Sequence, residues 1–218
     1  ACLIARQKEA GGLEVVGIGH QLSRGIKSGT ITDISEAETS IVAAVHAAEQ
    51  MVGETIEEVM VSIGGSPTKS RNVAVELDVL AEGVSDQDIA DLIHKGCQSI
   101  EESGQEIIHC FPTHYVLDGQ RHIRDPRGMI GKVLGSELQV VTAKSVALRN
   151  LSNCLARCHL NISEFVLAPH ASALAVLEPD EMDLGVTLID MGGGMTSFSV
   201  FAGGKNVYSD AVMIGGNH

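Results

Sequence analysis

The sequence contains no tryptophan, and aromatic residues make up only 3% of its 218 residues. A hydrophobic content of 44% is still enough for a real core, so that core must be aliphatic. Long apolar runs are missing as well, since none approaches the roughly 18 residues that a membrane-spanning helix needs. No signal peptide opens the sequence. The length of 218 residues fits one large domain or two small ones.

Positive charge is scarce. The chain has 15 Lys and Arg against 28 Asp and Glu, which gives a formal net charge of −13 and a pI near 5.0. This balance argues against a nucleic-acid partner and against adhesion of this segment to anionic lipid. The cysteines are odd in number and lie in or beside apolar segments, which predicts reduced, buried thiols in a cytosolic protein. They are Cys2, Cys97, Cys110, Cys154 and Cys158.

Two groups of His and Cys residues are weak candidates for a metal site. Cys154 and Cys158, followed by His159, share one face of a predicted helix with leucines, which is typical of a core. No CxxC motif or second ligand pair accompanies them. His109 and His114 are expected to be strand or loop residues. The sequence therefore predicts no metal at either group.

The most informative stretch is a glycine loop between two apolar segments. Residues 186–189 form an apolar run that is typical of a strand buried on both faces, and the run ends on Asp190. Gly192, Gly193 and Gly194 follow, and glycines can reach positive φ and bring backbone N–H groups close to an anion. The residues after them alternate in polarity up to a turn at 203–204. The pattern predicts a loop that joins two antiparallel strands.

That context decides between phosphate-binding motifs. A Walker loop needs Gly-Lys-Ser/Thr at the start of a helix, and no lysine is present here. A dinucleotide fingerprint also needs a helix after its glycines. The order strand, Asp, three glycines, Thr, strand resembles the phosphate hairpin of the actin, hexokinase and 70-kDa chaperone superfamily. The alternative is a glycine-rich hairpin without a ligand, which the aspartate at the strand end makes less favoured.

The chain before this hairpin predicts alternating strands and helices. Strands are expected at 1–6, 13–19 and 56–63, with a loop at 23–32 and a helix that has Asp33 or Ser35 as N-cap and ends at Gly53. Residues 65–142 predict a small β-α-β-β block, with a helix capped by Ser85, a strand at 104–115 broken at Pro112, a loop at 121–131 and a strand at 137–141. A helix at 144–158, a strand at 162–167 and a short helix at 170–177 complete the α/β pattern.

The hairpins at 1–19 and 198–218 are alike in length, in their glycine turn and in their Ile-Gly ending. Only the second follows a glycine loop. If the two form an internal repeat, a first phosphate loop is expected just before Ala1.

With these segments placed, the chain resembles the FtsA family of bacterial cell-division actin homologues over nearly its whole length. The segments 23–29 (Ser-Arg-Gly-Ile-Lys-Ser-Gly) and 124–129 (Arg-Asp-Pro-Arg-Gly-Met) carry this resemblance most specifically. The glycine loop alone points only to the superfamily. Further matching residues are Asp33 and the segments 61–66, 118–119, 171–175, 190–194 and 214–218.

The resemblance implies an α/β fold: an actin-like (ribonuclease H-like) domain with a mixed sheet flanked by helices and a small inserted α+β domain. Residues 1–64 plus 143–218 would be an incomplete nucleotide-binding half, and 65–142 the insert. The family uses this insert in self-association and in contacts with later division proteins. Its Arg121, Arg124 and Arg127 could touch an acidic partner, although a solvated loop is the favoured alternative.

The resemblance also implies ATP and Mg²⁺ as cofactors of the intact protein, with Asp190 facing the metal. The expected nucleotide contacts lie in the glycine loop and in a later glycine pair: Asp190, Gly192, Gly193, Gly194, Met195, Thr196, Gly215 and Gly216. The opposite wall of the cleft is expected to lie outside this chain, so the chain alone is expected to bind nucleotide poorly or not at all.

The partners that the resemblance implies are other copies of the protein in a filament, FtsZ and further division proteins. The expected location is the cytoplasmic face of the cell membrane at the division site. Contact with the membrane would be made through a C-terminal helix that is missing here.

Departures from the family pattern bear on catalysis. The family usually has Thr directly after the glycines and often Asp two places later, where Met195 and Ser197 stand here. The wider superfamily often has Gln or Glu before the proline at 169, where Ala168 stands here. We therefore expect at most a weak ATPase and assign no catalytic residue.

Two other readings stay open. A sugar kinase or a chaperone-type ATPase of the same superfamily is one, but a kinase needs a general base for its substrate hydroxyl, and Asp190 is the only well-placed carboxylate. A pilus-assembly adaptor with the same fold is the other, and it would differ mainly at a partner-peptide groove.

Overall fold

The computed structural model describes residues 1–9, 11–65, 67–80, 83–100 and 103–217. These form two compact units, Ala1–Val61 with Val146–Phe165, and Ser62–Ser145 with Val166–His218. Ser66 and His218, each part of a family-like segment, lie outside the described residues. The predicted division at 64/65 and 142/143 stays a prediction.

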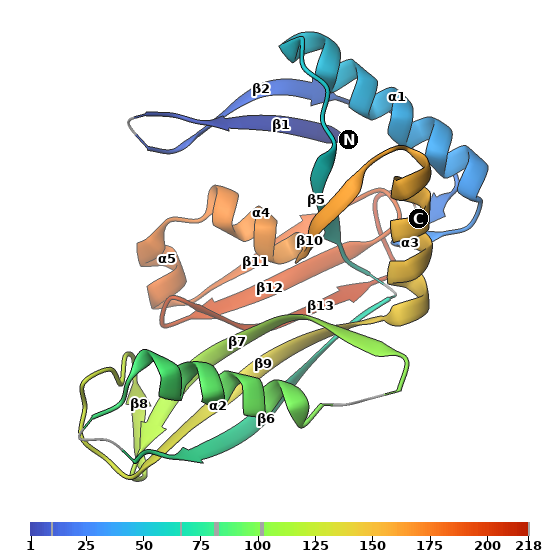
Figure 1. Cartoon of the computed structure of the whole chain (residues 1–218). Helices are drawn as coiled ribbons and strands as arrows, with labels where there is room; N and C mark the ends of the chain where they lie inside the picture. Colours follow the sequence, from blue (N-terminus) through green and yellow to red (C-terminus); the bar gives the residue numbers. More distant parts are fainter. Residues whose placement is uncertain (10, 66, 81–82, 101–102, 218) are drawn as a thin grey trace. The chain divides into compact units, whose positions relative to one another are not determined.

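A β-hairpin opens the first unit. Strand β1 (Cys2–Gln7) pairs antiparallel with β2 (Leu13–Gly19), as the sequence predicted (Figure 1). Helix α1 (Ile34–Val52) packs against β2. A Cβ atom at Gly19 would collide with the backbone carbonyl of Ala44, and one at Gly17 would lie 2.6 Å from the carbonyl oxygen of Ala48. The glycines of β2 thus let strand and helix backbones touch.

Helix α1 has the predicted caps at both ends. The Asp33 Oδ1 atom accepts a hydrogen bond of 2.9 Å from the Glu36 amide. At the other end Gly53 is left-handed, with φ 76°, and its N–H donates to the Glu49 carbonyl at 2.7 Å. Both caps satisfy backbone groups that a helix leaves open at its ends.

We expect Asp33→Ala to lower the free energy of unfolding by about 1 kcal/mol, because an N-cap side chain is lost. Asp33→Ser keeps a capping oxygen and is expected to stay close to wild type. Urea unfolding followed by circular dichroism measures both. Equal stability of the alanine and serine variants would contradict the capping role.

The remaining elements of the first unit include one that the sequence did not predict. Strands β3 (Ile26–Lys27) and β4 (Thr30–Ile31) form a short hairpin in the segment that was predicted to be a loop. Strands of two residues are too short to show the alternation of apolar and polar residues by which a strand is recognised in a sequence. Strand β5 (Glu58–Ile63) pairs with β10 (Asn161–Leu167), and α3 (Ser145–Arg157) is tied to α1 by the ion pair of Arg157 with Glu38 at 2.7 Å.

The second unit contains a four-stranded antiparallel sheet in the order β6-β9-β7-β8. Its strands are β6 (Thr68–Asp78), β9 (Val133–Lys144), β7 (Gln105–Leu117) and β8 (Gln120–Ile123). Helix α2 (Asp86–Gln98), capped by Ser85 as predicted, covers one face. The main core lies between this helix and the sheet and includes Val75, Ile89, Leu92, Leu134, Leu138 and Val140.

The predicted break at Pro112 is wrong. Strand β7 runs unbroken through this residue, and its register against β9 shifts between Ile107 and His109 and again between Pro112 and His114. At the second shift Thr113 is the residue without a partner on β9, so Pro112 stands beside a bulge, one of the places where a strand tolerates proline. Strand β8 likewise occupies part of the predicted loop at 121–131, and β9 is longer than the predicted 137–141.

A three-stranded antiparallel sheet follows two short helices in the second unit. Helices α4 (Ala168–Val176) and α5 (Pro179–Leu184) lead into β11 (Val186–Met191), β12 (Thr196–Ala202) and β13 (Lys205–Val212). Gly203 and Gly204 form the predicted turn, with φ 59° and 75°. Helix α5 was not predicted, although its capping box of Glu178 and Glu181 is visible in the sequence.

Burial of β11 on both faces was predicted, and this is wrong. Val186 and Leu188 are half-buried, whereas Ile189 and Met191 are 64% and 70% exposed. The reason is the position of the strand, which lies at the edge of the meander β11-β12-β13 with α4 packed against it. An edge strand of an antiparallel sheet alternates between a covered and an open face.

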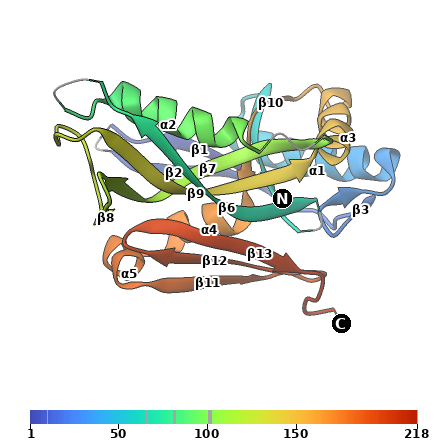
Figure 2. The ribbon, with the colours of Figure 1, turned by 90° about the horizontal axis from the view of Figure 1, so that it is seen from below.

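The β11–β13 sheet lies on the side of the β6–β9 sheet that points away from α2 (Figure 2). Part of the contact between the two sheets is polar. Gln139 is fully buried there. In the orientation of the side-chain amide that satisfies both of its polar atoms, the Gln139 oxygen accepts a hydrogen bond of 2.9 Å from the Ser209 backbone amide. The Gln139 nitrogen donates one of 2.9 Å to the Asn206 backbone carbonyl. Ser199 and Ser209 share a hydrogen bond of 2.8 Å. We call Gln139, Ser199, Asn206 and Ser209 the polar interface.

Candidate functional site

The glycine loop, Gly192–Met195, joins β11 to β12 as predicted. Met191 pairs with Thr196 directly across it, and β12 starts at Thr196 as a strand. The Gly192 amide donates to the Met195 carbonyl at 2.9 Å, which closes the loop. The strand-loop-strand prediction is therefore confirmed.

The reason for glycine in this loop differs from the prediction. None of Gly192, Gly193 and Gly194 has a φ in the left-handed region. At Gly193 the reason is instead the lack of space for a Cβ atom. A Cβ at Gly193 would lie 2.9 Å from the side-chain nitrogen of Asn217, whereas one at Gly194 would meet nothing within 4 Å.

The segment Ile214–Asn217 holds the glycine loop from the other side, and we call it the closing segment. The Gly216 amide donates to the Gly192 carbonyl at 2.9 Å, and the Asn217 amide donates to the Gly193 carbonyl at 2.8 Å. A Cβ at Gly215 would lie 2.7 Å from the carbonyl carbon and oxygen of Gly193. The structure thus brings the predicted residues Gly215 and Gly216 against the loop.

Two backbone donors of the loop are free. Within the described part of the chain, the amides of Gly193 and Gly194 donate no hydrogen bond, and both residues are exposed. Successive unpaired N–H groups in a loop attract anions. The closing segment uses the carbonyl groups of Gly192 and Gly193, so it leaves these donors available.

Asp190 lies at the end of β11, next to the glycine loop. Its carboxylate is half-buried and accepts a hydrogen bond of 3.2 Å from the Ser172 hydroxyl of α4 through Oδ2. The Oδ1 atom has no partner among the described residues. A single carboxylate suits Mg²⁺, which binds one or two carboxylates and completes its shell with phosphate and water. No cluster of three or more potential metal ligands occurs in the described ranges.

Neither hydroxyl group at the start of β12 faces the glycine loop as a free group on the surface. The Thr196 hydroxyl donates to the Ile214 carbonyl at 2.7 Å, and Ser197 is buried. The Met195 side chain reaches toward Gly64, since a Cβ at Gly64 would lie 3.5 Å from Ala168 and 3.9 Å from Met195. The loop therefore presents backbone groups, and no side chain at Ala168 can position a water molecule.

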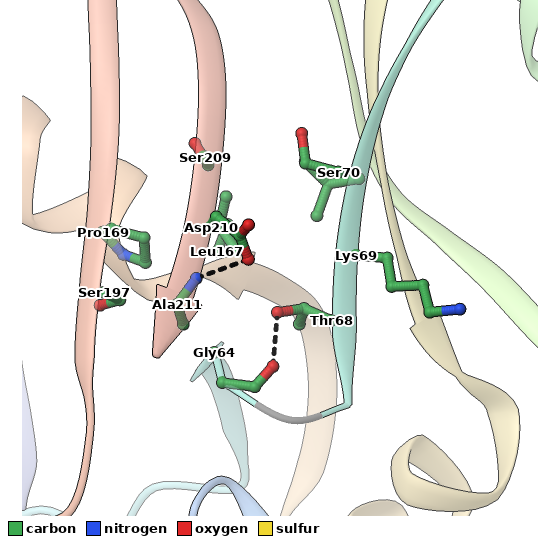
Figure 3. A pocket seen from close by; sticks show the side chains of 12 residues that line it. Gly64, Thr68, Lys69, Ser70, Leu167, Pro169, Ser197, Ser209, Asp210 and Ala211 are labelled. Atoms are coloured by element: carbon green, nitrogen blue, oxygen red, sulfur yellow. Dashed lines mark hydrogen bonds between the residues drawn. The ribbon is translucent and has the colours of Figure 1, made fainter. Parts of the chain in front are cut away.

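A cavity of about 10 Å³, roughly the volume that one water molecule needs, lies beside this region. Figure 3 shows Thr68 and Ser70 of β6 on one side and Ser197 and Ser209 of the hairpin strands on the other. It is too small for a nucleotide.

Residues that were weighed as metal ligands or partner contacts have other roles. All five cysteines are unbridged, but only Cys154 is fully buried, which corrects the prediction for the other four. Burial and a hydrogen bond with Cys97 raise the pKa of Cys110 to about 12. His109 stacks on Phe111, with 5.0 Å between the ring centres.

Among the described helices, none is long and apolar enough to cross a bilayer.

Two of the three arginines in the segment 121–127 form ion pairs within the chain. Arg124 forms an ion pair with Asp183, and Arg127 contacts Asp86 at 2.6 Å and Asp125 at 3.0 Å. All of these side chains are largely exposed, so the pairs contribute little stability. The pairing favours the solvated-loop alternative over a contact with an acidic partner.

The fold and the insert define the class of protein. Residues 65–142 match the family described as "SHS2 domain inserted in FTSA". A structure of the "PilM-PilN type IV pilus biogenesis complex" superposes with a TM-score of 0.71 at 11% identity and covers 99% of this chain and 58% of its own. The chain thus has an actin-like fold with an inserted SHS2 domain, which confirms the predicted fold class.

Comparison with curated relatives shows what the whole chain is similar to. The chain is 43% identical to "Cell division protein FtsA" of Rhizobium meliloti (strain 1021) over 206 residues, which are 94% of this chain and 47% of the relative. It is 34% identical to the FtsA protein of Pseudomonas aeruginosa over 99% of this chain and 52% of that one. The corresponding protein of Bacillus subtilis is 31% identical, over 94% and 47%. Over nearly its whole length the chain is thus similar to FtsA proteins, and it spans about half the length of these relatives.

Proposed function

We propose that the glycine loop is one wall of a Mg²⁺–ATP cleft in a division protein whose assembly depends on nucleotide. The observation that carries this proposal is the pair of free amides at Gly193 and Gly194. They follow the end of β11, where the Asp190 carboxylate lies. A phosphate fits the amides and Mg²⁺ fits the carboxylate, so the donor set suits both groups.

The residues of this chain would have distinct tasks at such a site. The amides of Gly193 and Gly194 would bind phosphate oxygens, while the closing segment fixes the loop by its hydrogen bonds. Asp190 would bind the metal directly or through water, with Ser172 orienting its carboxylate. Mg²⁺, when bound, neutralises phosphate charge. Ala168 supplies no group to activate water, which supports weak hydrolysis at most and no catalytic residue in this chain.

The wider role that we propose follows from the family. The relatives are named as cell division proteins, and the insert matches the SHS2 domain of FtsA. We propose that the complete protein polymerises, binds FtsZ and other division proteins, and connects them to the cytoplasmic face of the membrane. The kinase and pilus-adaptor readings are less favoured, because identities of 31–43% to FtsA proteins contrast with 11% to the pilus structure.

We expect Asp190→Ala, made in a full-length protein with this sequence, to weaken Mg²⁺–ATP binding by about 10- to 100-fold. The estimate follows from the loss of one charged contact of about 1.5–3 kcal/mol. Isothermal titration with ATP, with and without Mg²⁺, measures the effect. Because the carboxylate acts through the metal, the variant and wild type should bind ATP alike in EDTA.

Asp180→Ala is the matched control, since Asp180 is an exposed carboxylate on α5 away from the glycine loop. It is expected to bind Mg²⁺–ATP like wild type, and both variants should keep the wild-type unfolding transition. Wild-type affinity in Asp190→Ala would refute the metal assignment.

A further inference from the structure

A second, larger cavity lies in the second unit, between the insert sheet and the tip of the β12–β13 hairpin. It measures about 400 Å³, within the range of small-molecule pockets. Strands β6 to β9 line one side, and residues on either side of the Gly203–Gly204 turn line the other. We call it the hairpin-tip pocket, and the residues that matter to it are Thr113, His114, His122, Glu137 and Lys205.

Lys205 is the half-buried cation of this pocket. Its ammonium group lies 4.6 Å from the centre of the Tyr115 ring. No carboxylate of the described residues lies within ion-pair distance of it. Burial lowers the pKa of Lys205, with Asp125 opposing that effect and two arginines adding to it. A half-buried ammonium without a counter-ion favours an anion beside it.

Two imidazoles add hydrogen-bonding groups. The rings of His114 and His122 lie 5.6 Å apart, and the Thr113 hydroxyl is 3.2 Å from His114 Nδ1. His122 has a φ of 61°, a left-handed conformation that is uncommon outside glycine. Such a backbone costs free energy and tends to occur where function requires a side chain in a particular place.

The remaining charges define what the pocket accepts. Arg124 is the second cation of the lining, and it is largely exposed and paired with Asp183. Glu137 is the carboxylate of the lining and is the cross-strand partner of His114. It would repel a polyanion, but it can accept a hydrogen bond from a hydroxyl group of the ligand. The lining therefore suits a small ligand that has one anionic group and one donor.

We propose that the hairpin-tip pocket binds a small oxyanion that carries a hydroxyl group, a hydroxycarboxylate or hydrogen phosphate, with Lys205 as its counter-ion and His114 and His122 as donors. This site is separate from the glycine loop and does not depend on nucleotide binding.

Calorimetric titration of this chain with malate and with inorganic phosphate, against sodium chloride of equal ionic strength, tests the proposal. We expect saturable binding of at least one of the two, with a Kd below about 10 mM, and none of chloride. The two arms show which oxyanion the pocket prefers. Lys205→Met is expected to weaken that binding at least about tenfold, the effect of one lost charged contact.

Lys132→Met is the matched control, because Lys132 is exposed, carries the same charge and lies outside the pocket. It should bind like wild type. His122→Asn, which keeps a residue that tolerates the left-handed backbone, should weaken binding without loss of fold. If Lys205→Met does not fold, the oxyanion affinity of His122→Asn tests the proposal in its place. Absence of saturable binding, or equal losses in the two lysine variants, would overturn the proposal.

Discussion

Gly215→Val is expected to displace the glycine loop and to lower the ATP affinity of the full-length protein by about a hundredfold, or about 3 kcal/mol. A Cβ at this position would lie 2.7 Å from the carbonyl carbon and oxygen of Gly193, both backbone atoms that no rotamer change can move aside. The clash would also separate the Gly216 and Asn217 amides from the loop carbonyls that they bind. The loop would then lose the shape that exposes its free donors.

Gly194→Ala is the control for this variant, because a Cβ there meets nothing within 4 Å. Gly193→Val should have an intermediate effect, since its closest neighbour is the movable end of the Asn217 side chain. NMR amide shifts of this chain report the loop geometry, and ATP titration of the full-length protein reports binding. Wild-type affinity in Gly215→Val, or a loss in Gly194→Ala of equal size, would contradict the role of the closing segment.

Gln139→Leu is expected to lower the free energy of unfolding of this chain by about 2–4 kcal/mol. Leucine fills a similar volume but leaves the Ser209 amide and the Asn206 carbonyl without their partner. Each buried polar group left unsatisfied costs about 1–3 kcal/mol. Urea unfolding measures the change.

Gln120→Leu is the matched control for Gln139→Leu, because Gln120 is an exposed glutamine on β8. It should stay within about 0.5 kcal/mol of wild type. A double-mutant cycle with Asn206→Leu isolates the coupling across the polar interface. Additive effects in that cycle would show that the two residues do not act together.

The sequence predicted local features well where a few neighbouring residues decide them. The cap at Asp33, the turn at Gly203–Gly204 and the strand-loop-strand order around the glycine loop all follow from local backbone chemistry. The predicted site residues Gly215 and Gly216 came from a family resemblance, and the structure places them against the loop. Their assignment to ATP stays a prediction.

What the sequence could not predict depends on contacts between distant segments. The need for glycine at 215 arises from the backbone of Gly192 and Gly193, and no local pattern in the sequence predicts such a close approach. From the sequence, a glutamine within a strand is expected to be exposed. The burial of Gln139 cannot be predicted locally, because its hydrogen-bond partners Asn206 and Ser209 are far along the chain. The exposed face of β11 was missed because an apolar run does not reveal whether a strand is central or at an edge.

The polar interface also determines how independently the two sheets can behave. The apolar core of the insert lies on the α2 side of its sheet, whereas Gln139 and its partners occupy the opposite side. If the sheets parted, solvent could take over each of these hydrogen bonds, but the contact of the Phe111 ring with His170, which in turn stacks on Phe201, would be lost. This boundary therefore combines hydrogen bonds that water can replace with ring contacts that only the joined layers provide.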